Sequence, residues 1–218
     1  MPDLMSRAAI ILCGGRSSRM GRDKALLPFG SELMLQRVTR IVSQVVSPEN
    51  IVVVAAGEQR LPALSAALTI ARDDIAFRGP LAGIATGLHA LEVKSPLEAD
   101  AIFATGCDFP LLVPAIIDRM FELLDNFDAA VPVDGEHHHA LTAVYSPNVL
   151  PKIENLLAAD RLRAQYLFTE VNTRKVPVDA LRDVDPTLNS LRNVNSAADY
   201  EAALATAGVP PNRNTPLG

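Results

Sequence analysis

Short runs of apolar, largely β-branched residues alternate along the chain with longer amphipathic segments. Continuous or alternating apolar runs of this length predict strands, here over residues 8–12, 51–56, 101–105, 129–133 and 141–145. Apolar residues at a spacing of three and four predict helices, here over residues 33–46, 114–124, 153–159 and 197–207, and a further helix after Gly79-Pro80. A small segment around residues 64–71 lies between these elements.

This alternation predicts an α/β fold, a three-layer sandwich around a mostly parallel central sheet. The first three strand candidates are apolar at nearly every position, as expected of strands covered on both faces. The stretch 135–145 predicts a local antiparallel addition to that sheet. Ligands of open α/β sheets bind beyond the carboxyl ends of the strands, so the residues that follow Leu12, Ala55 and Thr105 are the first candidates for a site.

Composition narrows the class of protein. The chain has 218 residues, 49% of them hydrophobic and 21% charged, which is a globular composition. We expect a single domain over residues 1–207 and a loose tail over 208–218. The net charge of −5 argues against nucleic acid as a partner. Only two cysteines, Cys13 and Cys107, are present, so a disulfide framework is excluded and a reducing cytoplasm fits. No apolar run is long enough to span a membrane, and the N-terminus has no signal-peptide pattern.

A glycine-rich, basic segment follows the first predicted strand. It runs from Leu12 to Lys24 and combines glycines, two serines and several arginines. Glycine lets the backbone approach a phosphate closely, and cations neutralise phosphate charge, so this composition suits a triphosphate site. The spacing matches neither the P-loop nor the dinucleotide fingerprint. On its chemistry alone the segment also fits a surface loop with solvated arginines.

The same segment, Leu-Cys-Gly-Gly-x-Ser-x-Arg-Met-Gly-x-Asp-Lys-Ala, resembles the signature of the molybdenum cofactor guanylyltransferases, which belong to the nucleotidyltransferase superfamily. Three further segments resemble that family in the same order, at residues 78–83, 106–110 and 192–196. The resemblance extends from about Ala8 to Leu204. The pair Asp23-Lys24 favours the guanylyltransferases, because the related cytidylyltransferases typically carry Pro before the lysine.

The resemblance implies a fold like that of the nucleotide-diphospho-sugar transferases and transfer of GMP from GTP to the molybdopterin cofactor, with release of pyrophosphate. It implies nucleotide binding at Leu12, Cys13, Gly14, Gly15 and Asp73, although the alignment also allows Asp74 in place of Asp73. It implies catalytic roles on the nucleotide phosphates for Arg19, Lys24 and Asp108, the last as a ligand of Mg²⁺. It places Arg161, Asn193 and Asn195 on the acceptor side. The chain departs from the family at Cys13, where Ala is usual, and at Ala55-Ala56, where some members have Asn.

Several of these residues also have purely structural interpretations. Asp108 directly follows a predicted strand, where a carboxylate suits Mg²⁺, but it also fits a helix cap or an Asx-turn. The segment Gly79–Gly83 fits either an anion site at a helix N-terminus or simple helix initiation. Arg161 fits either an acceptor contact or a solvated helix terminus. Cys13 and Cys107, which both follow predicted strands and could lie near each other, fit buried free thiols.

The run His137-His138-His139 suggests a metal site only weakly. Consecutive residues of an extended segment point to opposite faces, so at most two of these imidazoles could share one ion. A polar hairpin tip is the preferred interpretation, although the resemblance allows an acceptor contact for His139.

Two other functions stay open from the sequence: another nucleotidyltransferase with a cytidylyl donor or a sugar-phosphate acceptor, and a non-catalytic nucleotide-binding module. Besides GTP and molybdopterin, other cofactor-assembly proteins or molybdoenzymes are candidate partners.

Overall fold

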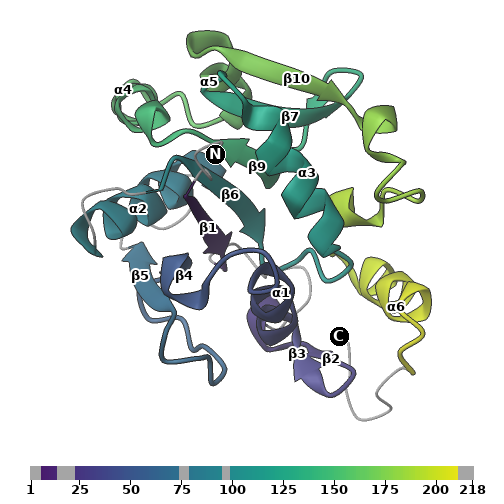
Figure 1. Cartoon of the computed structure of the whole chain (residues 1–218). Coiled ribbons are helices and arrows are strands. Elements are labelled where there is room, and N and C mark those ends of the chain that lie inside the picture. Colours follow the sequence, from purple (N-terminus) through teal and green to yellow (C-terminus); the bar gives the residue numbers. More distant parts are fainter. Residues whose placement is uncertain (1–5, 14–22, 74–78, 95–98, 211–218) are drawn as a thin grey trace.

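A computed structural model of the chain describes residues 6–13, 23–73, 79–94 and 99–210. Within these ranges the centre of the fold is an eight-stranded sheet with the strand order β10-β7-β9-β6-β1-β4-β5, to which the short β8 is added on β7 (Figure 1). The strands are β1 (Arg7–Leu12), β4 (Ile51–Ala56), β5 (Thr69–Asp73), β6 (Ala101–Gly106), β7 (Ala129–Asp134), β8 (His137–His138), β9 (Thr142–Tyr145) and β10 (Thr173–Pro177). A separate hairpin consists of β2 (Pro28–Phe29) and β3 (Glu32–Leu33).

The sheet is mostly parallel, as the sequence predicts. Strand β1 pairs in parallel with both β4 and β6, β4 pairs in parallel with β5, and β10 pairs in parallel with β7. Strand β9 runs antiparallel to its neighbours β6 and β7, and β8 runs antiparallel to β7. The predicted antiparallel addition over 135–145 is therefore confirmed, and one of its strands lies inside the sheet rather than at its edge.

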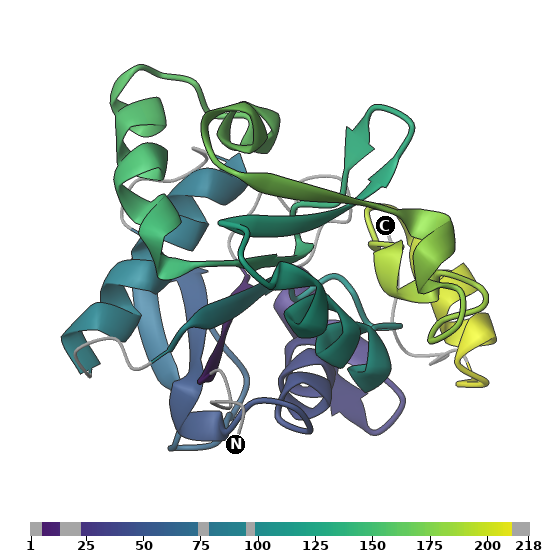
Figure 2. The same cartoon turned by 45° about the horizontal axis from the view of Figure 1, so that its top comes forward.

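Helices cover both faces of the sheet because its strands are apolar on both sides. Alternate residues of β1 enter different cores: Ala9 and Ile11 pack with α1 (Met34–Val42) and α3 (Pro114–Leu124), whereas Ala8 and Ile10 pack with α2 (Gly79–Lys94) and α4 (Leu150–Ala158). Helix α5 (Ala164–Glu170) joins the second core through Leu167 and Phe168. Figure 2 shows α2 and α4 on the left of the sheet and α1 and α3 on its right, which confirms the three-layer arrangement.

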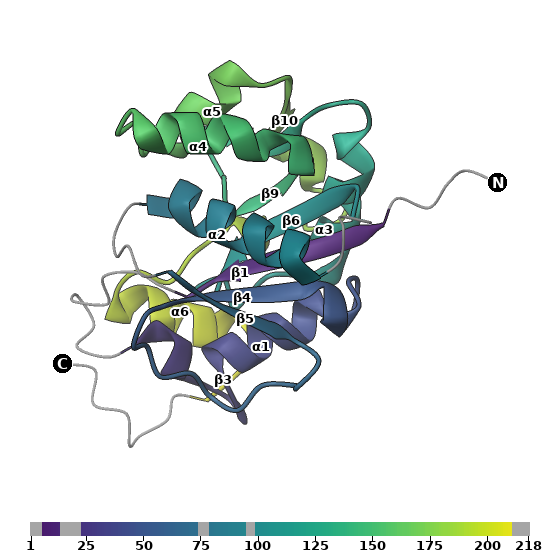
Figure 3. The same ribbon diagram turned by 90° about the vertical axis from the view of Figure 1, so that its left-hand side faces the viewer.

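A third, smaller core attaches the last helix to the β2–β3 hairpin. Helix α6 (Ala197–Thr206) packs Tyr200, Ala203 and Leu204 against Leu27, Phe29 and Met34. The Tyr200 hydroxyl donates a hydrogen bond to the carbonyl of Pro28, and its ring meets Phe29 edge to face. Figures 1 and 3 both show α6 beside α1. Segments from opposite ends of the sequence are thereby held together.

The structure corrects two of the predicted elements and adds two that the sequence analysis did not assign. The helix predicted over 33–46 ends at Val42. Near that end the hydroxyls of Thr39 and Ser43 hydrogen-bond to carbonyls of the preceding turn, a competition that disfavours helix continuation. The segment around 64–71 overlaps the edge strand β5, Thr69–Asp73, which is only partly buried and has no continuous apolar run. Helix α5 and strand β10 lie in a stretch for which the sequence analysis assigned no element.

Among the helices of the described ranges, none is long and apolar enough to cross a membrane.

Candidate active site

The carboxyl ends of the central strands meet at one edge of the sheet. Leu12, the last residue of β1, is in register with Val54 of β4 and with Gly106 of β6. Both ladders continue one step further, because the Cys13 N–H donates to the Val54 carbonyl at 2.8 Å and the Cys107 N–H donates to the Leu12 carbonyl at 2.9 Å. The residues that follow β1 and β6 are thus fixed side by side.

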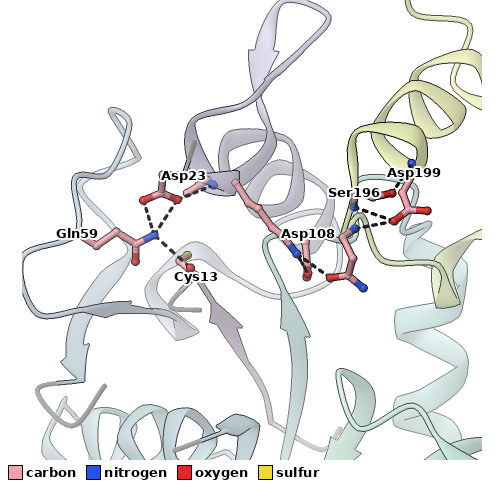
Figure 4. A network of polar contacts seen from close by, with 9 residues as sticks. Cys13, Asp23, Gln59, Asp108, Ser196 and Asp199 are labelled. Atoms are coloured by element: carbon pink, nitrogen blue, oxygen red, sulfur yellow. Dashed lines mark hydrogen bonds and ion pairs between the residues drawn. The ribbon is translucent and has the colours of Figure 1, made fainter. Parts of the chain in front are cut away.

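Lys24 joins residues from two distant parts of the chain at this edge. Its Nζ lies 2.9 Å from Oδ2 of Asp108 and 2.8 Å from Oδ1 of Asn195. The side chains of Lys24 and Asp108 are only 17% and 18% exposed, so solvent screens this ion pair less than it would screen a surface pair. A cation, a carboxylate and an amide oxygen therefore converge beyond the ends of β1 and β6 (Figure 4).

Asp108 depends on the glycine two residues before it. A Cβ on Gly106 would lie 2.4 Å from Oδ1 of Asp108, so any other residue there would displace the carboxylate. The Asp108 carbonyl accepts a hydrogen bond from the Val194 N–H at 2.8 Å, which links the segment after β6 to the segment that carries Asn195. Asp108 does not cap α3, because Val113 occupies that position.

Lys24 is the first residue of a short 3-10 helix, Lys24–Leu26. Asp23 caps this helix by accepting the Ala25 N–H at 3.0 Å, and the Leu27 N–H closes it on the Lys24 carbonyl at 3.1 Å. The backbone around Lys24 is therefore fixed by local hydrogen bonds.

Asn195 is held by the start of α6. Oδ2 of Asp199 accepts the backbone N–H groups of Asn195 and Ser196 at 3.0 and 2.9 Å, while the Ser196 hydroxyl accepts the Asp199 N–H. This is a capping box, and it continues the polar network at the right of Figure 4. Hydrogen bonding, first with Ser196 and then with the Asn195 backbone, lowers the pKa of the Asp199 carboxyl.

The two cysteines are neighbours beneath this edge. Cys13 and Cys107 belong to the same apolar core and are 7% and 3% exposed. A hydrogen bond with Cys13, and then burial, raises the pKa of the Cys107 thiol, so Cys107 is a neutral thiol at pH 7. This is the expected character of a buried structural thiol, and neither residue forms a disulfide.

The structure describes only some of the other predicted site residues. Gly14, Gly15 and Arg19 are outside the described residues, as are Arg78 and Asp74. Asp73 ends β5 in register with Ala56, at the same edge of the sheet but beyond β4. Asn193 is exposed, two residues before Asn195.

Arg161 lies outside the Lys24 cluster, which consists of Lys24, Asp108 and Asn195. It pairs with Glu170 at 2.9 Å and its guanidinium lies over the Tyr166 ring. Its neighbour Leu162 approaches the start of α2, since a Cβ on Gly79 would lie 3.1 Å from the Leu162 carbonyl. The connection between α4 and α5 is therefore held against the start of α2, for which the sequence leaves an anion site and simple helix initiation both open.

Within the described part of the chain no group of three or more His, Cys, Asp or Glu residues could hold a metal ion. The rings of His137 and His139 meet edge to face, with centroids 4.6 Å apart, whereas His138 stacks on Phe168. The three histidines thus alternate as the sequence predicts, and two imidazoles are the most that share one side.

Three residues of the polar networks escaped the sequence analysis as site residues. Ser196 and Asp199 have the spacing of a capping box before an apolar helix, a signal that could have been recognised. Gln59, which contacts Asp23 and Cys13, carries no such signal, because its partners lie 36 and 46 residues away in sequence.

Comparison with known proteins identifies the family. The model of the MobA-like NTP transferase domain matches residues 9–174. "Probable molybdenum cofactor guanylyltransferase" of Mycobacterium avium is 36% identical over 93% of this chain and 97% of its own length. The protein of the same name from Pelotomaculum thermopropionicum is 31% identical over 94% of this chain and 95% of its own length.

Solved structures share the fold. Molybdopterin-guanine dinucleotide biosynthesis protein A from Archaeoglobus fulgidus superposes with a TM-score of 0.75 at 20% identity, over 93% of this chain and 98% of that one. A 2-C-methyl-D-erythritol 4-phosphate cytidylyltransferase from Thermus thermophilus superposes with a TM-score of 0.67 at 15% identity, over 94% of this chain and 100% of that one. The Gly-rich signature, the strand order and these matches agree, and the chain belongs to the MobA-like NTP transferase family of nucleotidyltransferases.

Proposed function

We propose that this enzyme transfers GMP from GTP to the terminal phosphate of molybdopterin in a Mg²⁺-dependent reaction that releases pyrophosphate. The observation that carries the proposal is the convergence of Lys24, Asp108 and Asn195 beyond the carboxyl ends of β1 and β6. The names of the relatives, molybdenum cofactor guanylyltransferases at 31% to 36% identity, supply the donor and the acceptor.

The reaction needs no nucleophile from the enzyme. An oxygen of the acceptor phosphate attacks the α-phosphorus of GTP, a new P–O bond forms, and the bond from that phosphorus to the α–β bridging oxygen breaks. Both bond-breaking electrons leave with pyrophosphate. The task of the chain is therefore to place the two phosphates in line and to neutralise charge in the transition state.

Lys24 is the described residue best suited to neutralise that charge. Its ammonium is largely shielded from solvent and already paired with oxygen atoms, as it would be with phosphate oxygens. In the proposal Arg19 assists Lys24, while Leu12, Cys13, Gly14, Gly15 and Asp73 contact the nucleotide. Removing one preorganised contact of this kind typically lowers the rate by about 10²- to 10³-fold.

Asp108 is the proposed ligand of Mg²⁺. The ion usually takes one or two protein carboxylates and completes its shell with water and phosphate oxygens, so a partly buried carboxylate beside the proposed phosphate-binding lysine fits it. When bound, Mg²⁺ polarises the phosphoryl oxygens and neutralises charge on the leaving pyrophosphate. Asp108 also keeps Lys24 oriented toward the same point through their ion pair.

Asn193, Asn195 and Arg161 are the proposed acceptor contacts. Asn195 directly precedes the N-cap of α6 and its Oδ1 meets the Lys24 ammonium, which suits a residue between donor and acceptor. Arg161 stands on the loop next to the start of α2 and would meet a different part of the acceptor.

Nucleotide selectivity is the first test. We expect GTP with Mg²⁺ to raise the melting temperature more than CTP, ATP or UTP, and EDTA to diminish the shift. A ligand at about 100 times its Kd adds about 2.7 kcal/mol to folding stability, which is readily measured. A preference for CTP would reassign the donor, and no response to any triphosphate would contradict the nucleotidyltransferase reaction.

The matched variants are Lys24→Ala and Lys152→Ala. Lys152 is exposed on α4, away from the site, and its removal should leave both the GTP shift and the release of pyrophosphate unchanged. Lys24→Ala should remove most of the shift and lower GMP transfer to molybdopterin about 10²- to 10³-fold. Normal transfer by Lys24→Ala would exclude Lys24 from the reaction.

A further inference from the structure

Gln59 occupies the centre of a second hydrogen-bond network beside the Lys24 cluster. Its Nε2 donates to the Cys13 carbonyl at 3.1 Å and to the Asp23 carboxylate oxygens at 3.0 and 2.8 Å. Its Oε1 accepts the Ala56 N–H at 3.1 Å. Figure 4 shows Gln59 reaching from the segment after β4 toward Cys13 and Asp23. The amide nitrogen and the amide oxygen of Gln59 therefore both form hydrogen bonds.

The two residues that Gln59 holds have a particular place in the chain. Cys13 directly precedes and Asp23 directly follows residues 14–22, the Gly-rich part of the proposed phosphate site. Asp23 also caps the short helix that begins with Lys24. One side chain thus fixes the distance between the end of β1 and the residue that positions Lys24.

Gln59 is itself anchored from the edge of the sheet. Arg72 on β5 donates from Nη1 to the carbonyls of Ala56 and Gln59, at 3.0 and 2.7 Å. The turn that follows β4 is therefore tied to β5 through its backbone, which leaves the Gln59 amide directed toward Asp23. A continuous series of contacts therefore runs from Arg72 through Gln59 and Asp23 to Lys24.

We infer that Gln59 is a positioning residue for the nucleotidyl transfer: by holding Asp23 and the Cys13 carbonyl it sets where Lys24 stands relative to Asp108. The inference rests on the proposed function. The network requires an amide, since a glutamate of the same length would present an acceptor to the Asp23 carboxylate and to the Cys13 carbonyl. Two carboxyl groups in such contact could bond only by sharing a proton.

Gln59→Glu is therefore the most informative variant. At pH 8 we expect GMP transfer to fall about 10- to 100-fold, since a displacement of about 1 Å at a reacting group can cost that much. As the pH is lowered toward 6, one proton enters the pair formed by the introduced carboxyl and Asp23, and the ratio of variant to wild-type activity should rise several-fold. The charged and titratable groups in contact with position 59 are the Asp23 carboxylate and the Arg72 guanidinium, whereas Cys13 contacts it through its backbone carbonyl.

A second substitution reverses the hydrogen bond. Asn at position 23 can still cap the Lys24 helix and can donate its amide to a carboxylate at position 59. The double variant Asp23→Asn/Gln59→Glu should thus recover most of the lost activity at pH 8 and lose the pH dependence. Gln59→Met keeps the side-chain length without hydrogen bonds, and it should be impaired equally at both pH values. It also stands in for Gln59→Glu should that protein fail to fold.

Gln36 supplies the control. Its amide also joins two backbone groups, the Leu33 N–H and the Ala63 carbonyl, but it lies on α1 away from the cluster. Gln36→Glu should leave transfer and its pH profile unchanged. If wild-type protein neither binds GTP nor releases pyrophosphate, the proposed function fails. If wild type is active and Gln59→Glu matches it at pH 8, or its relative activity does not rise toward pH 6, the role of Gln59 alone is refuted.

Discussion

At the scale of single residues, the site depends on contacts that leave no room for larger side chains. Gly106 ends β6 beneath the Asp108 carboxylate, and a Cβ there would lie 2.4 Å from Oδ1, far inside a normal contact. The nearest obstacle is the proposed metal ligand itself, so relieving the conflict would shift the Asp108 carboxylate from the position in which it pairs with Lys24. The glycine is thus a requirement of the site rather than of the strand.

Gly106→Ala should therefore lower GMP transfer by at least about 10-fold, with a smaller effect on stability. The reason is displacement of Asp108 from the point where it meets Lys24. Steady-state transfer at several Mg²⁺ concentrations measures the effect, and the variant should need more Mg²⁺ than wild type. Unchanged Mg²⁺ dependence together with unchanged turnover would mean that Asp108 tolerates the displacement and is not the ligand.

The lowered pKa of His139 predicts that the stability of the folded protein decreases in acid. Burial, and then the neighbouring His137, lower the pKa of His139 to about 4 from an ordinary value near 6.5, with Asp134 acting in the opposite direction. Between these values the unfolded chain binds a proton that the folded chain does not. Stability therefore falls as the pH drops from about 6.5 to about 4.

His139→Gln removes that proton and should lose less stability over this range than wild type, as measured by urea unfolding at pH 7, 5.5 and 4.5. His89→Gln is the control, because His89 is about half exposed on α2 and paired with Glu154. Equal acid sensitivity of wild type and His139→Gln would show that the imidazole is solvated in the folded state.

At the scale of elements, the sequence analysis correctly predicted the strands and helices that have a strong apolar pattern. The apolar runs located β1, β4, β6 and β7 closely, and α3 has the predicted bounds. Their pattern is strong because both faces of each strand are covered. Asp108 could be placed at a strand end for the same reason.

The elements that were missed or misplaced are those whose secondary structure depends on contacts with neighbouring elements and not on a local apolar pattern. Strand β5 is half exposed at the edge of the sheet, and β10 carries Arg174 and Lys175, so neither has a continuous apolar run. Gln59 belongs to the same class: its importance comes from Asp23, which only the fold brings beside it. Contacts of this kind are set by tertiary structure, and the local sequence does not contain them.

Close packing of α2 on β1 is a testable consequence at this scale. A Cβ on Gly87 would lie 2.7 to 2.8 Å from three atoms of the Ile10 side chain, which is fully buried. Overpacking costs about 1–3 kcal/mol, whereas alanine in a helix gains back up to about 1 kcal/mol over glycine. Crowding from three atoms should exceed the gain, so Gly87→Ala should be destabilising by about 1 kcal/mol or more.

Urea unfolding of Gly87→Ala, Ile10→Ala and the double variant measures this effect. Removing the Ile10 side chain opens the space that a methyl group at position 87 needs, so the double variant should be more stable than the sum of the two single losses implies. Strict additivity would mean that the helix shifts freely and that the close approach is not required.

At the scale of the whole molecule, the last helix brings the two ends of the described chain together at the site. Helix α6 packs on the hairpin that follows Lys24, and its N-terminal capping box holds Asn195 within 2.8 Å of the Lys24 ammonium. The distance between the proposed donor and acceptor sides is therefore set by a small apolar core. Tyr200 is central to it, being 3% exposed and in contact with both Phe29 and Pro28.

Two substitutions of Tyr200 measure separately what its hydrogen bond and its ring packing contribute to stability. Tyr200→Phe keeps the ring and leaves the Pro28 carbonyl without its donor, so we expect a loss of about 1 kcal/mol in unfolding free energy. Tyr200→Ala removes the ring as well and should lose about 3–5 kcal/mol, the range found for large aromatic residues in cores. Because α6 carries Asn195 through its cap, the alanine variant should also weaken use of the acceptor more than binding of GTP. A Tyr200→Ala protein as stable as wild type, with an unchanged KM for molybdopterin, would mean that α6 does not hold the acceptor side in place.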